Sequence, residues 1–128
     1  MNSNNFQIGD ILYSTHRDLR KGYHPIIYLQ PLSEREFIGG MISHSDINNN
    51  IKLSDNYLEE KDSLSNQYIV TSDNSFLVVA KLVKFESWGP FRKVGKLTNQ
   101  GLGFVQKTLE NCRTETFANY FRRMKKIT

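Results

Sequence analysis

The chain has 128 residues, of which 38% are hydrophobic and 23% are charged, and its formal net charge is +4. This length suits a single domain with a sizeable core, and the composition is typical of a soluble globular protein. No apolar run is long enough for a transmembrane helix, which excludes a membrane-spanning protein and predicts no membrane partner.

The chain begins with polar residues and lacks the charged start and apolar stretch of a signal peptide. Short β-favouring runs separated by polar or Gly/Asn/Asp-rich stretches then dominate the first two-thirds of the sequence. Such spacing is typical of a small barrel or sandwich. The predicted strands are Gln7–Thr15, Pro25–Gln30, Glu36–Ser43, Asn50–Leu53, Gln67–Thr71 and Phe76–Phe85. Gly39-Gly40 inside the third predicted strand indicates a bulge or a sharp bend.

Two helices are predicted after the strands. Thr98 or Asn99 can cap the first, in which Leu102, Val105 and Leu109 share one face. The second has an amphipathic stripe of Phe117, Tyr120, Phe121 and Met124. We expect this stripe to belong to the core, and the alternative is a docking face for a second subunit or a partner helix.

The basic excess lies entirely in residues 113–128, around the second predicted helix. A basic tail can bind nucleic acid or an acidic partner, although it can also be a solvated helix end. The single cysteine, Cys112, cannot form an internal disulfide. Together with the lack of a signal peptide, it favours a cytoplasmic protein.

Two neighbouring strands carry the strongest candidate site. Suppose that Pro25–Gln30 and Glu36–Ser43 pair as a hairpin, with Leu29 or Gln30 facing Ile38 or Phe37. His24 then lies opposite Ser43, and directly opposed side chains share one face of a sheet. His44 follows at once, so two imidazoles and a hydroxyl are expected to meet at one end of the hairpin.

The order of segments resembles the PemK/MazF family of toxin endoribonucleases over about residues 8 to 110. The shared features are Gly9-Asp10-Ile11 near the start, a strand that ends in Ser43-His44-Ser45, and Lys93-Val94-Gly95-Lys96-Leu97-Thr98 before an amphipathic helix. The resemblance implies a mainly β fold with C-terminal helices, a small SH3-like β-barrel. It also implies a homodimer that cleaves RNA without a metal and is neutralised by a partner antitoxin.

The resemblance also implies roles for individual positions. The catalytic hydroxyl of the family lines up with Ser43, and the position of its catalytic arginine, before Pro25, holds His24. The missing positive charge is then expected from the preceding loop, which contains Arg17, Arg20 and Lys21.

Metal-free RNA cleavage needs a base for the 2′-hydroxyl, a donor for the phosphate and an acid for the leaving 5′-oxygen. Histidine suits both proton steps because its ordinary pKa is about 6.5. We therefore predict that His24 and His44 share the acid and base roles and that Ser43 contacts a phosphate oxygen. Trp88, Arg92 and Lys93 are predicted to bind RNA by stacking and charge.

No cofactor or metal is predicted, because the chain lacks a phosphate-binding glycine motif and any recognised spacing of zinc ligands. The whole chain is predicted to be one domain, with a core of about residues 6–110 and an added basic helix of about 114–126. The leading function is cleavage of single-stranded RNA as the toxin of a toxin–antitoxin pair. The alternative is a non-catalytic barrel that binds nucleic acid or a protein partner.

Overall fold

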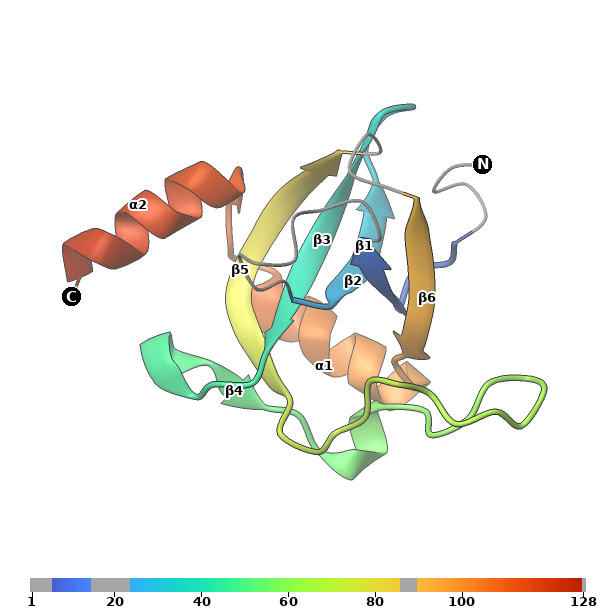
Figure 1. Ribbon diagram of the computed structural model, residues 1–128. Helices are drawn as coiled ribbons and strands as arrows, with labels where there is room; N and C mark the ends of the chain where they lie inside the picture. The colour runs from blue at the N-terminus through green and yellow to red at the C-terminus, as the bar shows by residue number, and fades with distance from the viewer. Residues whose placement is uncertain (1–5, 15–23, 86–89, 128) are drawn as a thin grey trace.

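A curved seven-stranded sheet forms the centre of the computed structural model, which describes residues 6–14, 24–85 and 90–127 (Figure 1). Its strands run in the order β4-β5-β3-β2-β1-β6, and β7 lies beside β5. Neighbouring strands are antiparallel except for β5 and β7, which are parallel. The strands are β1 (Asp10–Ser14), β2 (Ile26–Pro31), β3 (Glu36–Ser43), β4 (Ile51–Lys52), β5 (Phe76–Phe85), β6 (Phe91–Lys96) and β7 (Thr114–Glu115).

Helix α1 (Asn99–Leu109) crosses one face of the sheet, and its start is fixed by a cap. The Thr98 hydroxyl accepts a hydrogen bond of 2.9 Å from the Gly101 N–H, as the sequence predicts for an N-cap residue. Two short 3₁₀ helices, η3 (Ile47–Asn49) and η4 (Asp55–Tyr57), interrupt the connection between β3 and β5. Helix α2 (Phe117–Ile127) follows β7 and extends away from the edge of the sheet (Figure 1).

The two faces of the sheet bury separate apolar clusters, because side chains alternate along each strand. On the α1 face, Ile27, Ile42 and Leu77 pack in one cluster with Val105 and Leu109 of the helix. On the opposite face, one cluster contains Leu12, Ile26, Tyr28, Phe37 and Phe91. A second cluster on that face contains Met41, Val78, Ala80, Leu82 and Tyr120, with Met124 packed against it.

Most predicted elements are present, but one predicted strand is absent, and β6 and β7 are not among the predicted strands. The strands Glu36–Ser43 and Phe76–Phe85 have the predicted bounds. The prediction of a strand at Gln67–Thr71 is wrong, since this segment forms an isolated bridge at Gln67 and separate main-chain bonds from the N–H groups of Tyr68 and Val70 instead of a continuous ladder. Strand β6 was not predicted, because its central residues Arg92 and Lys93 hide the alternation of a buried strand.

The apolar stripe of α2 is only partly buried. Tyr120 is 9% exposed and packs on β5, but Phe117 and Phe121 are 39% and 53% exposed. The expectation that the whole stripe belongs to the core is therefore wrong for these two phenylalanines. A helix that reaches beyond the sheet edge can bury only the side chains nearest the strands.

The mainly β fold with C-terminal helices is confirmed by the arrangement of these elements. The register between β3 and β5 shifts between Gly39 and Met41, which confirms the irregularity predicted at the paired glycines. Within the part of the chain that the structure describes, no helix has the length and apolar character needed to cross a membrane.

Candidate functional site

Strands β2 and β3 pair in the predicted register at the end where the candidate site lies. Ile26 pairs with Met41, and Tyr28 pairs with Gly39. The N–H of Ile42 also donates to the Pro25 carbonyl at 3.0 Å, which extends this register toward His24. Nearer the connector the predicted pairing is wrong by one residue, because an irregularity after Tyr28 places Gln30 opposite Ile38.

His24 lies just before β2, where the residue as a whole is exposed. Partial burial of its imidazole lowers the pKa of His24 below its ordinary value of 6.5. A hydrogen bond to the main chain of Ile42 acts in the opposite direction, while the positive charges of Lys84 and His44 lower the pKa further. His24 is therefore mostly neutral at pH 7 and able to accept a proton.

His44 is exposed just beyond β3 and is held through one ring nitrogen. Its Nδ1 lies 2.9 Å from the carbonyl oxygen of Asn74. A carbonyl can only accept, so Nδ1–H donates and Nε2 is left for chemistry. Asn74 has a φ of 58°, a left-handed conformation that asparagine tolerates and that places its carbonyl in the turn before β5.

Ser43 ends β3 and begins the series of turns that follows. It is only 8% exposed, and its hydroxyl oxygen accepts a hydrogen bond of 3.1 Å from the Ser45 N–H. The Ser45 hydroxyl in turn accepts from the Ile47 N–H. Because the Ser43 oxygen accepts in this bond, its O–H can still donate to another group. The two bonds also fix the backbone of residues 43–47, which includes His44.

Lys84 also influences this site, although it is not among the residues predicted from the sequence. It is 5% exposed and lies on β5, and its charge acts on His24. The signal was present in the sequence, because Val78, Ala80, Leu82 and Lys84 alternate along one strand. Within that pattern the lysine occupies a position where an apolar residue is expected.

The predicted RNA contacts of β6 lie elsewhere on the sheet. The Lys93 ammonium is 3.1 Å from the carboxylate of Asp10, which is buried, and the Lys96 ammonium is 3.5 Å from the same oxygen. Burial lowers the pKa of Lys93, but the hydrogen bond and charge of Asp10, together with Tyr68, raise it above its ordinary value. Lys93 thus has a structural partner, and its predicted contact with RNA stays a prediction.

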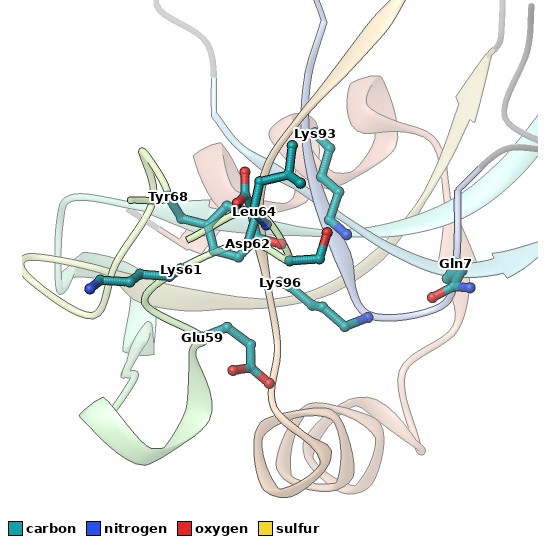
Figure 2. Close-up of a pocket in the computed structure, with 9 residues that line it drawn as sticks. Gln7, Glu59, Lys61, Asp62, Leu64, Tyr68, Lys93 and Lys96 are labelled. Atoms are coloured by element: carbon teal, nitrogen blue, oxygen red, sulfur yellow. Dashed lines mark hydrogen bonds between the residues drawn. The ribbon is translucent and has the colours of Figure 1, made fainter. Parts of the chain in front are cut away.

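A hollow of about 480 Å³ lies beside these lysines, between β6 and the 59–68 loop (Figure 2). Three of its lining residues are basic and two are acidic, and the buried Asp10 adjoins them. The charges therefore balance, and the hollow lacks the positive surplus that attracts a phosphate backbone. The charged residues that line it are Glu59, Lys61, Asp62, Lys93 and Lys96.

Several predicted residues are not brought into this arrangement. Arg92 is exposed on β6, where it pairs in register with Tyr13 of β1. Arg17, Arg20, Lys21 and Trp88 lie outside the described residues. The described part of the site thus consists of His24, Ser43 and His44.

No family model, no curated protein and no solved structure matches this chain. The resemblance to the PemK/MazF family therefore stays a prediction from the sequence, and the function has to be argued from the site.

Proposed function

We propose that this protein is a metal-independent endoribonuclease that cleaves single-stranded RNA. The observation that carries the proposal is the convergence of His24 and His44 at one end of β2 and β3, close enough for the charge of one to affect the other. Two imidazoles at one site supply both the base and the acid that RNA cleavage requires.

In the proposed mechanism His24 is the general base, since its lowered pKa keeps it neutral at pH 7. It takes the proton of the 2′-hydroxyl, and the 2′-oxygen attacks the adjacent phosphorus to form a 2′,3′-cyclic phosphate. The bond from phosphorus to the 5′-oxygen breaks as the Nε2 of protonated His44 donates its proton to that oxygen. The Ser43 O–H donates to a phosphate oxygen during the attack.

Cleavage of a long single-stranded RNA in excess EDTA tests this function. We expect the purified protein to convert the RNA to discrete fragments that end in cyclic phosphate. Mass spectrometry of the fragments reads the chemistry of those ends directly. Intact RNA at high protein concentration and across several buffers would exclude the enzyme and leave a binding protein.

For the biological role, the PemK/MazF resemblance supports an SH3-like barrel and the toxin of a type II toxin–antitoxin pair, with an antitoxin protein as its partner. It also supports a homodimer. The second candidate function, a module that binds a protein partner, is favoured by a separate observation, which is the exposure of Phe117 and Phe121 on α2.

The exposed face of α2 provides a test of self-association. If a second copy covers this face, the wild-type protein sediments as a dimer and Phe121→Glu sediments as a monomer, because a buried carboxylate is costly. Phe121 is 53% exposed, so circular dichroism should show that the variant is still folded. A monomeric wild-type protein would assign the face to another partner or to solvent.

A further inference from the structure

Helix α2 exposes large apolar side chains in a part of the chain that is rich in positive charge. Phe117 and Phe121 are 39% and 53% exposed, and their rings stack with 6.1 Å between the centroids. Five basic residues and one acidic residue lie at positions 113–128, around this helix. A partner that covers the two rings therefore has to present apolar contacts together with negative charge.

Only one side of α2 packs on the sheet. Tyr120 is buried there in the cluster that includes residues of β3 and β5, and Met124 packs against the same cluster. On the exposed surface of the helix, Arg122 donates to the side-chain oxygen of Asn119. A neutral acceptor does not cancel the positive charge of Arg122, so this charge can attract an acidic partner.

The segment 55–73, which runs from η4 toward the turn before β5, has the opposite charge. It contains five acidic residues and one basic residue. Four of its carboxylates border a hollow of about 250 Å³, in which no lining residue that the structure describes is basic. Lys52 donates to the carbonyl of Ser72 at this hollow and offsets one of the four charges. The four carboxylates belong to Asp55, Glu59, Glu60 and Asp73.

The same acidic segment also exposes apolar side chains. Leu64 is 79% exposed and Ile69 is 57% exposed. The Asp62 carboxylate accepts hydrogen bonds from the N–H groups of Leu64 and Asn66 at 2.8 and 2.9 Å, which holds the loop around Leu64 in one conformation. The segment thus combines negative charge with apolar contacts, which is the combination that the exposed face of α2 requires.

The two surfaces lie apart within one copy of the chain. Tyr120 anchors α2 on the sheet, and Figure 1 shows the helix extending from the sheet on a different side from η4 and the 59–68 loop. Each copy carries both surfaces, so one copy can offer its helix to the acidic segment of another and receive a helix in return. Charge complementarity therefore favours a second copy of this chain as the occupant.

We propose that α2 of one copy docks on the acidic segment 55–73 of a second copy. The basic side of the helix faces the four carboxylates, and Phe117 and Phe121 contact the exposed apolar side chains of the segment. The contact deepens the proposed homodimer, on which it rests, by naming the two surfaces that meet. It does not depend on RNA cleavage.

Exchanging charges between the two surfaces tests the proposal by sedimentation velocity. Arg122→Glu and Glu60→Lys change exposed residues, and each places like charges across the contact. We expect each variant alone to self-associate at least about tenfold more weakly than wild type. An equal mixture of the two should associate again, because the acidic helix of one variant then meets the basic segment of the other.

The matched control is Arg35→Glu, which makes the same change of net charge at an exposed position in the connector between β2 and β3. It should self-associate as wild type does. Circular dichroism checks that each variant is folded. Self-association that neither Arg122→Glu nor Glu60→Lys weakens, or a mixture that stays monomeric, would overturn the proposal.

Salt dependence of the wild-type protein gives a second test that needs no variant. Raising the salt concentration from about 0.1 to 1 M shortens the Debye length from about 10 to 3 Å, so a contact between opposite charges weakens. A purely apolar contact is not screened in this way. Self-association that is unchanged or stronger at the higher salt concentration would overturn the proposal.

The contact and the enzyme can fail separately. A monomeric wild-type protein that cleaves RNA keeps the enzyme and loses the contact. A protein that associates through these surfaces but leaves RNA intact keeps the contact and loses the enzyme. A wild-type dimer that both charge variants leave intact keeps the homodimer and loses this contact.

Discussion

Replacing His24 or His44 with alanine is expected to lower the rate of RNA cleavage by about 10²- to 10⁴-fold, the usual contribution of a general base or acid. Both imidazoles lie at the surface end of β2 and β3 rather than in the core, so the fold should survive either change. Cleavage of a fluorescent RNA in EDTA gives the rates, and circular dichroism confirms that each variant is folded. Unchanged rates in both variants would end the two-histidine mechanism.

A matched variant separates proton transfer from structure at His44. The amide N–H of His44→Asn can replace Nδ1–H as the donor to the Asn74 carbonyl, but it has no nitrogen at the Nε2 position and transfers no proton. We expect His44→Asn to be as inactive as His44→Ala while being at least as stable. If His44→Asn cleaved RNA at the wild-type rate while His44→Ala did not, His44 would act only by holding the turn before β5.

The pH dependence of the cleavage rate tests the assignment of His24 as the general base. A protonated base cannot accept the proton of the 2′-hydroxyl, so the rate falls as the pH drops through the His24 pKa. Because burial lowers that pKa, the midpoint of the acid limb should lie below 6.5. A midpoint above that value would contradict the assignment of His24 as the base.

The hairpin that carries the site was predictable because its register follows from local patterns. Two apolar runs flank a short polar connector, which indicates a hairpin. The pairing of Ile26 with Met41 and of Tyr28 with Gly39 is the predicted one. The shift after Tyr28 was not predictable, since such irregularities depend on how the sheet curves and not on a residue preference. The difference from the predicted register is confined to the residues near the connector, and the pairing next to His24 is as predicted.

Lys84 and Asp10 were missed because their roles depend on tertiary contacts. The sequence places Lys84 forty-one residues from Ser43, and only the pairing of β3 with β5 brings its stem across Gly39. Similarly, Lys93 was assigned to RNA because nothing in the sequence shows that Asp10 lies next to it across β1 and β6. Charge alone does not show whether a lysine faces solvent or neutralises a buried carboxylate.

The two glycines of α1 should respond to alanine in opposite directions, although both lie in the same helix. At Gly101 a Cβ would lie 2.1 Å from the carbonyl oxygen of Tyr57 in η4, which is much closer than non-bonded carbon and oxygen atoms can approach. The helix would have to move away from the loop that holds its cap. We expect Gly101→Ala to lower the free energy of unfolding by about 3 kcal/mol, at the upper end of the usual cost of overpacking.

Gly103 is the matched control, because it is exposed and a Cβ there would meet nothing within 4 Å. Alanine is the better helix former, so Gly103→Ala should raise the free energy of unfolding by about 0.5–1 kcal/mol. Urea denaturation of the two variants measures both changes. If both variants were stabilised, helix propensity would outweigh the contact between α1 and η4. The contact of α1 with Ile42 would then be less close than in the structure. This contact matters for the site because the main chain of Ile42 forms a hydrogen bond with the His24 ring.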